Sequence, residues 1–312
     1  MSLSLNRAPI LSLGLCLALC FPAATLAQDK RASELQPAQL LQNVATLREE
    51  IEQIRLTIGK RLPRSREFKL ADVEPRQVFF QAQTLFRKCN RLAQEVAGVS
   101  RQAPMSAPEH DVSSVDVNTM IDAARQQLQL VKKALEISAE PAAPKLRRRT
   151  TSADVMHDII EAGYILNQLV SERADWADIY DRVAQMQTYI GGGLPDQARY
   201  PTLPDYECCK MPQDVYALLA EAMDRARPLA ESVDLALIRV IPGKAAEGGA
   251  STDTVYDLTT TMVSDLAELT LRMELDEVAG PSYERPPRIY PSHVYALAKV
   301  LGDQITTLNT SR

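Results

Sequence analysis

An apolar pattern that recurs seven times limits what this chain can fold into more than any other feature. Each copy opens with Pro, Ser or Thr and carries an aliphatic residue three positions later, which is followed by apolar or small residues at +4, +7, +11 and +14. This 3.5-residue period places one stripe along an α-helix, as in bundles and coiled coils. The copies start at Pro37, Pro75, Ser114, Ser152, Pro212, Thr252 and Pro291.

The residues around these starts independently predict helix N-termini. Pro fits the first helical position, because the N–H it lacks would have no partner there. Where Pro is absent, the preceding residue is Ser113, Thr151 or Ser251, and each is a good N-cap. Asp116 and Asp154 stand three residues after two of these caps, which is the spacing of a capping box.

The spacing of the copies predicts one unusually long helix. Neighbouring copies stand 38 to 40 residues apart, except for one step of 60. Within that step, Trp176 lies 21 residues after Val155 and begins a degenerate eighth copy. Because 21 residues are three heptads, the stripe continues in phase, and it predicts a single helix of about 38 residues from Ser152 to Ile190. Arg173 occupies a stripe position and is expected to interrupt the core.

The sequence therefore predicts an all-α helical-repeat protein of about seven helices. We expect two antiparallel four-helix-bundle units that share the long central helix, with residues 28–172 in the first unit and residues 173–312 in the second. The alternative is an α-solenoid of four helical hairpins, since repeats of about 40 residues also occur in such arrays. The expected helices lie near 37–58, 75–97, 114–137, 152–190, 212–235, 252–275 and 291–309.

Residues 1–27 have the pattern of a secretory signal peptide. Arg7 is their only charge, an apolar run extends from Ala8 to Phe21, and small residues precede a cleavage point after Ala27. Cys20 raises the alternative of a lipoprotein, but Leu19 stands where a lipid-attachment site requires a small residue, which argues against it. We expect a mature chain of 285 residues in the periplasm or outside the cell.

The composition and the motifs exclude several function classes. The formal net charge is −5, without a basic face that would suit nucleic acid. After the signal peptide, no segment has the apolar length of a membrane span. No nucleophile elbow, phosphate loop or haem motif is present, and His110, His157 and His293 lack partners at metal-site spacing. We therefore expect no catalytic residues, no metal and no cofactor.

Three cysteines remain in the mature chain. Cys89 occupies a core position of its repeat, where it is expected to act as a small buried hydrophobe. Cys208 and Cys209 lie in a loop, and adjacent cysteines rarely bond each other because the peptide between them is strained. A disulfide from one of them to Cys89 and an exposed free thiol both remain open.

Large side chains follow the first aliphatic residue in five copies. One interpretation is that they cap the ends of the core, with tyrosine hydroxyls reaching loop carbonyls. The other is an aromatic cleft for a partner segment or a small ligand, since tyrosine is enriched at interfaces. These residues are Phe79, Met156, Tyr216, Tyr256 and Tyr295.

Four long loops contain Pro and Arg, and two of them also contain Tyr. They span residues 59–74, 138–151, 191–211 and 276–290, and the second contains the run Arg147–Arg149. Such a composition favours a semi-rigid binding surface, although solvated connectors are the alternative. Arg285, Arg288 and Tyr290 are the binding candidates in the last loop.

These observations favour a non-enzymatic, exported protein that acts as a protein-binding or scaffold module in the cell envelope. Its partner is expected to be another envelope protein or a second copy of the chain. The alternative is a periplasmic sensor or carrier that binds a small molecule between bundle helices, near the aromatic positions. A third hypothesis is a redox or metal role of Cys208 and Cys209.

Overall fold

The computed structural model describes residues 37–62, 68–70, 72–108, 111–142, 150–171, 174–240, 250–280 and 283–311. These residues all belong to one compact unit. The predicted signal peptide lies outside the described residues, as do His110, Arg147–Arg149 and Arg173.

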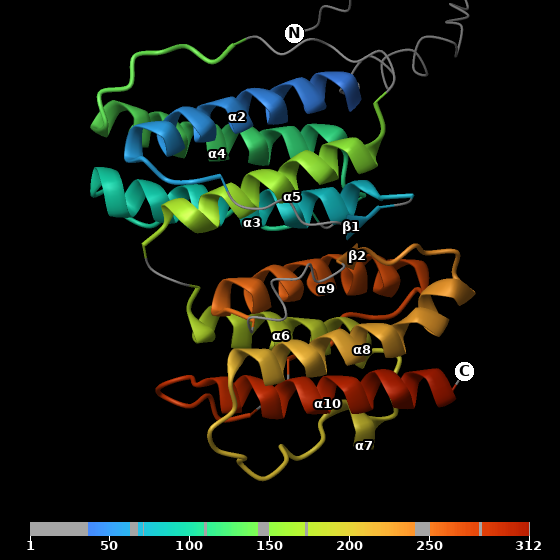
Figure 1. Ribbon diagram of the computed structural model, residues 1–312. Coiled ribbons are helices and arrows are strands. Elements are labelled where there is room, and N and C mark those ends of the chain that lie inside the picture. Colours follow the sequence, from blue (N-terminus) through green and yellow to red (C-terminus); the bar gives the residue numbers. More distant parts are fainter. Residues whose placement is uncertain are drawn as a thin grey trace, which may run out of the picture. The chain divides into compact units, whose positions relative to one another are not determined.

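The described residues are mainly helical, which confirms the all-α class (Figure 1). No helix among them combines the length and apolar character needed to cross a membrane. In chain order the elements are α2 (Pro37–Ile58), β1 (Phe68–Lys69), α3 (Pro75–Ala97), α4 (Ser114–Ala134), α5 (Ser152–Leu169), α6 (Trp176–Gly191), α7 (Asp196–Arg199), α8 (Pro212–Ser232), β2 (Arg239–Val240), α9 (Thr252–Arg272) and α10 (Pro291–Thr310).

The seven predicted helix starts are confirmed, each at the predicted residue. At α4, the backbone N–H of Ser113 donates to Asp116 Oδ2 at 2.8 Å, and the backbone N–H of Asp116 donates to Ser113 Oγ at 3.4 Å. Thr151 and Asp154 form the same reciprocal pair at the start of α5. These bonds satisfy N–H groups that have no partner inside the helix.

The prediction of one long central helix is wrong, because α5 and α6 are separate helices. The chain leaves helical geometry at Val170, where φ is −73° and ψ is 130°. It enters the next helix at Asp175, whose side chain accepts the backbone N–H of Ala177 at 3.1 Å. The stripe stays in phase across the break because 21 residues equal three heptads whether or not the backbone between them is helical.

The longer helices form two groups around separate cores. In the first helix group, α2 and α3 each contact both α4 and α5. In the second helix group, α6 and α8 each contact both α9 and α10. Each group surrounds one cluster of buried apolar side chains. Figure 1 shows the helices of each group lying side by side.

The first turns of α2, α3, α4 and α5 line one small hollow, so these four helices begin at the same end and run parallel. In the second group, Thr270 near the end of α9 donates to the carbonyl of Tyr189 near the end of α6. Asn309 near the end of α10 donates to the carbonyl of Arg225 in the second half of α8. The expected antiparallel arrangement within each unit is therefore wrong.

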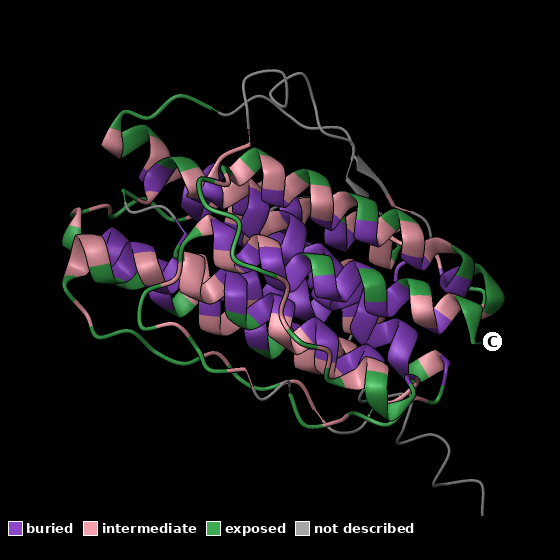
Figure 2. Ribbon diagram, turned by 90° about the horizontal axis from the view of Figure 1, so that it is seen from below, coloured by how far each residue is buried: buried purple, intermediate pink, exposed green. Residues whose placement is uncertain are grey.

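The stripe residues fill these cores, as predicted. Every stripe position of the seven copies is buried, with no side chain more than 5% exposed. In Figure 2 the buried positions follow the inner sides of the helices. Burial of apolar surface at about 25 cal/mol per Å² is the main stabilising contribution of such a face. The 3.5-residue pattern thus identified the core correctly in every copy.

Contacts between several elements join the two groups within the unit. Helix α3 of the first group contacts α9 of the second. In addition, β1 pairs with β2 in an antiparallel ladder that sets Phe68 opposite Val240. The sequence pattern did not predict this ladder, because a strand of two residues has no detectable alternation.

The two long loops of the second group pack against each other. The hydroxyl of Tyr283 donates to the carbonyl of Pro201 at 2.8 Å. Gly192, at the end of α6, lies so close to the second loop that a Cβ there would be 2.0 Å from the carbonyl oxygen of Asp276. These contacts fix residues 191–211 against residues 276–280 and 283–290. The loops 59–74 and 138–151 are described only in part.

Candidate functional site

The aromatic residues at the helix starts do not gather in one cleft. Phe79 is fully buried in the first core, where its ring meets that of Phe80 edge to face at 6.2 Å. Met156 is also fully buried there. Both side chains are therefore packing residues, which fits the interpretation that they close the core.

The three tyrosines of this set lie in different surroundings. The hydroxyl of Tyr256 accepts a hydrogen bond from Arg182 Nη2 at 2.9 Å, and the same guanidinium lies 4.4 Å from the ring centre. Tyr216 is half-buried on α8 and lines a small pocket described below. Tyr295 is half-buried on α10, with the ammonium group of Lys210 at 4.1 Å from its ring centre.

The candidate residues of the last loop lie at the start of α10. Arg285 pairs with Asp181 at 3.1 Å, and both side chains are exposed. Arg288 lies 5.3 Å from the ring centre of Tyr290. The backbone N–H of Tyr290 donates to His293 Nδ1 at 3.0 Å, and the rings of His293 and Tyr206 lie 5.0 Å apart. We name Tyr206, Arg288, Tyr290 and His293 the aromatic loop surface.

The three cysteines that the described residues contain, Cys89, Cys208 and Cys209, are free. Cys89 is fully buried, and this burial raises the pKa of its thiol strongly. Cys208 and Cys209 are exposed, with their sulfur atoms 3.0 Å apart. The core interpretation of Cys89 is thus confirmed, and the thiols of the loop pair are accessible.

Four polar side-chain pairs follow one another along the contact between α3 and α9, and we name this row of pairs the polar seam. Gln77 Nε2 donates to Asp265 Oδ1 at 2.6 Å. Three further pairs follow toward the end of α3, and their order shows that the two helices run antiparallel. They join Gln81 to Thr261 at 3.3 Å, Thr84 to Thr260 at 3.3 Å and Lys88 to Asp257 at 2.5 Å.

Asp265 lies at the most buried part of the polar seam. Its side chain is fully buried, and its second oxygen accepts the backbone N–H of Ile238 at 2.9 Å. Desolvation raises the pKa of Asp265 to about 7, although the hydrogen bonds from Ile238 and Gln77 act in the opposite direction. A carboxyl group in this position changes its charge near neutral pH.

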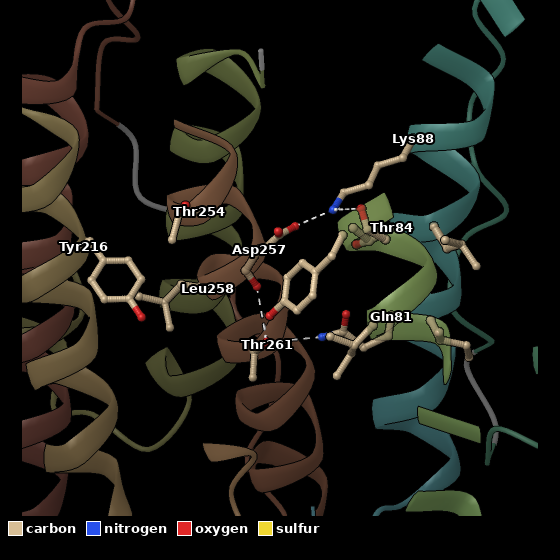
Figure 3. A pocket seen from close by; sticks show the side chains of 13 residues that line it. Gln81, Thr84, Lys88, Tyr216, Thr254, Asp257, Leu258 and Thr261 are labelled. Atoms are coloured by element: carbon tan, nitrogen blue, oxygen red, sulfur yellow. Dashed lines mark hydrogen bonds and ion pairs between the residues drawn. The ribbon is translucent and has the colours of Figure 1, made fainter. Parts of the chain in front are cut away.

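One side of the polar seam borders a small hollow, the inner pocket, shown in Figure 3. Lys88 extends from α3 toward Asp257 of α9, and Tyr216 lies on the far side of α9 from Lys88 (Figure 3). Apolar side chains such as Ile159 and Leu258 complete the lining. The free space is about 30 Å³, which is enough for water molecules only.

A larger hollow, the outer crevice, opens where α3 meets the starts of α6 and α9. It encloses about 230 Å³. Lys88 lines both hollows, so the outer crevice continues the polar seam. Its basic residues are Arg87, Lys88, Arg91 and Arg101, its acidic residues are Asp175, Asp178 and Asp253, and Gln94, Asn167 and Tyr256 also contribute.

Two of the four basic side chains are already neutralised. Lys88 pairs with Asp257, and Arg101 pairs with Asp178 at 3.3 Å. Arg87 and Arg91 form neither an ion pair nor a hydrogen bond with the side chains that the structure describes. The Nε atom of Arg87 is buried and has no hydrogen-bond partner in this part of the chain. Two guanidinium groups are therefore available to a ligand.

Among the residues that line the outer crevice, Tyr256 alone was a candidate from the sequence. Arg87 and Arg91 stand four positions apart on α3, so they share a face of the helix. That spacing was a detectable signal, but it is also common on solvated helix faces. Within the described ranges, no group of three or more His, Cys, Asp or Glu side chains is arranged to hold a metal ion.

The fold and the site together define an all-α protein with polar hollows where two helix groups meet. No family model, curated protein or solved structure matches the chain.

Proposed function

We propose that the protein is a non-enzymatic binding protein of the cell envelope that holds a small acidic ligand in the outer crevice. Export would depend on the signal peptide of residues 1–27. The two helix groups would be repeated four-helix-bundle units, with the boundary between them in the chain at residues 172 and 173. The ligand site would lie where the two units contact each other. This is the sensor or carrier alternative of the sequence analysis, with its site at Tyr256.

The observation that carries this proposal is the pair of unpaired guanidinium groups, Arg87 and Arg91. A buried polar atom without a partner costs free energy, and the Nε atom of Arg87 is such an atom. A guanidinium group presents several N–H donors in a fixed plane that matches a carboxylate or a phosphate. An acidic ligand in the outer crevice would satisfy both arginines at once.

The test is to replace both arginines and measure ligand binding. Acetate, propionate, succinate, inorganic phosphate and a set of amino acids are screened by thermal shift, and those that bind are titrated by calorimetry. The Arg87→Gln/Arg91→Gln variant is expected to bind the tightest probe at least about tenfold more weakly, because each charged hydrogen bond contributes about 1.5–3 kcal/mol.

The matched control for this test is Arg227→Gln on α8. Arg227 pairs with Asp224 three residues earlier and does not line the outer crevice. This variant is expected to bind as the unmodified protein does, and circular dichroism checks that all variants are folded. The proposal is wrong if none of these acids and amino acids binds, or if the double variant binds them unchanged.

A second candidate function is protein binding through the aromatic loop surface. Tyr206 is 57% exposed and Tyr290 is 44% exposed. Exposed tyrosine together with arginine is typical of the centre of a protein interface. The loops that carry these side chains are fixed against each other, so little ordering would be needed on binding. This candidate corresponds to the scaffold function favoured by the sequence.

Site-specific photo-crosslinking tests the second candidate. A photoreactive residue at position 206 or 290 is expected to give discrete crosslinked species with the chain itself or with one envelope protein. The control position is Leu56, which is 64% exposed on α2 and lies outside the aromatic loop surface. Equal crosslinking from position 56, or none from positions 206 and 290, would exclude this surface as an interface.

A further inference from the structure

Two carboxylates of the outer crevice indicate that the ligand has a second charged group besides its acidic group. Asp175 precedes α6, and one of its oxygens accepts the backbone N–H of Ala177 at 3.1 Å. Asp253 lies in the first turn of α9, where Oδ1 accepts the backbone N–H of Ala174 at 2.8 Å. Each bond occupies one oxygen, and neither carboxylate forms an ion pair with a residue of the described ranges.

The charges of the outer crevice are therefore balanced but separated. The pairs Lys88–Asp257 and Arg101–Asp178 neutralise themselves. What remains is two guanidinium groups from α3 and two carboxylates from the starts of α6 and α9. The hollow of about 230 Å³ has these opposite charges in its lining, and they come from different elements.

A purely anionic ligand would satisfy only the arginines. Bound there, it would add negative charge to a hollow that already holds two carboxylates without cationic partners, and like charges in a partly desolvated site repel. A ligand with a carboxylate at one end and an ammonium group at the other would complement both sets. Its ammonium group can donate up to three hydrogen bonds to the free carboxylate oxygens.

We propose that the ligand is an amino-acid-like zwitterion, with its carboxylate at Arg87 and Arg91 and its ammonium group at Asp175 and Asp253. This inference rests on the proposed function and deepens it. The size of the hollow agrees, since pockets for drug-sized molecules enclose about 300–1,000 Å³ and this one is smaller. Gln94 and Asn167 supply amide groups for a further polar contact.

The test compares amino acids with analogues that lack one of the two charges. L-Alanine, L-leucine and L-glutamate are titrated against propionate, isocaproate and glutarate, which lack the amino group, and ethylamine is the probe without a carboxylate. At least one of the three amino acids is expected to bind about tenfold or more tightly than its deamino analogue, because the latter leaves the carboxylates unpaired. Ethylamine is expected to bind more weakly than L-alanine.

A charge-removing variant assigns the preference to the two aspartates. In Asp175→Asn/Asp253→Asn, the amide oxygen still accepts the backbone N–H at each position. Asparagine is also as good an N-cap as aspartate at position 175. The advantage of the amino acid over its deamino analogue is expected to fall to about twofold or less in this variant. The matched control is Asp116→Asn at the start of α4, remote from the outer crevice, which is expected to keep the full advantage.

The outcomes separate this inference from the proposed function. If deamino acids bind as tightly as the amino acids, and only Arg87 and Arg91 matter, the zwitterion inference is overturned and the proposed function stands. If the aspartate variant keeps the full advantage, the placement of the ammonium group is overturned. If neither acids nor amino acids bind, the proposed function and this inference both fail.

Discussion

Replacing Phe79 with alanine is expected to lower the free energy of unfolding by about 3–5 kcal/mol. The ring is fully buried in the first core and packs edge to face on Phe80. Its removal loses the transfer free energy of the side chain and leaves a cavity that close-packed neighbours fill only in part. Urea denaturation of the two proteins, followed by circular dichroism, measures the difference.

The control for this prediction is Tyr290→Ala. Tyr290 is an aromatic residue at the start of a helix, as Phe79 is, but it is 44% exposed. Its replacement is expected to cost less than about 1 kcal/mol, as is usual for surface positions. If the two variants lost similar stability, Phe79 would not be the core residue that the structure shows.

Stability is expected to fall by about 2–3 kcal/mol between pH 5 and pH 8 because of Asp265 alone. Its pKa in the folded protein is raised from 3.8 to about 7, chiefly by desolvation. Between these two values the folded state binds more protons than the unfolded state, so the free energy of unfolding decreases as the pH rises. The contribution is fully present below the unfolded pKa and is lost as the pH rises through the folded pKa.

The Asp265→Asn variant isolates this contribution. Urea denaturation near pH 5 and near pH 8 gives the pH slope of each protein, and the slope of the variant is expected to be smaller by the stated amount. Other titrating groups, such as His293 with its lowered pKa, cancel in the difference between the two slopes. In the variant, the NH2 group of asparagine must face one of two donors, Gln77 Nε2 or the Ile238 N–H, where a carboxyl oxygen accepted before. We therefore also expect a loss of stability that is the same at both pH values. Identical slopes would show that Asp265 does not titrate in this range.

The stripe predicted the helix starts and core positions because both depend on local sequence. Pro291, for example, fits the first turn, and Val294 begins a face that must be buried wherever the helix packs. The stripe led to a wrong prediction between Leu169 and Trp176, because its phase is the same for one continuous helix and for two helices. Asp175, an N-cap residue directly before a stripe position, was the available signal of a new helix start.

The candidate site was largely hidden in the sequence because it depends on pairing between distant segments. Gln77 and Asp265 are 188 positions apart, and neither lies on a stripe that would mark it as buried. Gln81 and Thr261 are a similar pair of polar side chains, 180 positions apart and outside the stripe of each helix. These side chains become partners only because α3 packs on α9. The sequence alone does not specify that packing.

The polar seam also has a consequence for the order in which the chain folds. Its hydrogen bonds join residues 169 to 188 positions apart, whereas each apolar core lies within one half of the chain apart from single residues such as Ile238 and Phe80. Contacts that close long loops form late, because their entropy cost precedes any gain. We therefore expect each helix group to collapse on its own apolar face first. The joining of α3 to α9 would then be the final, slowest step of folding, and the outer crevice would exist only once it is complete.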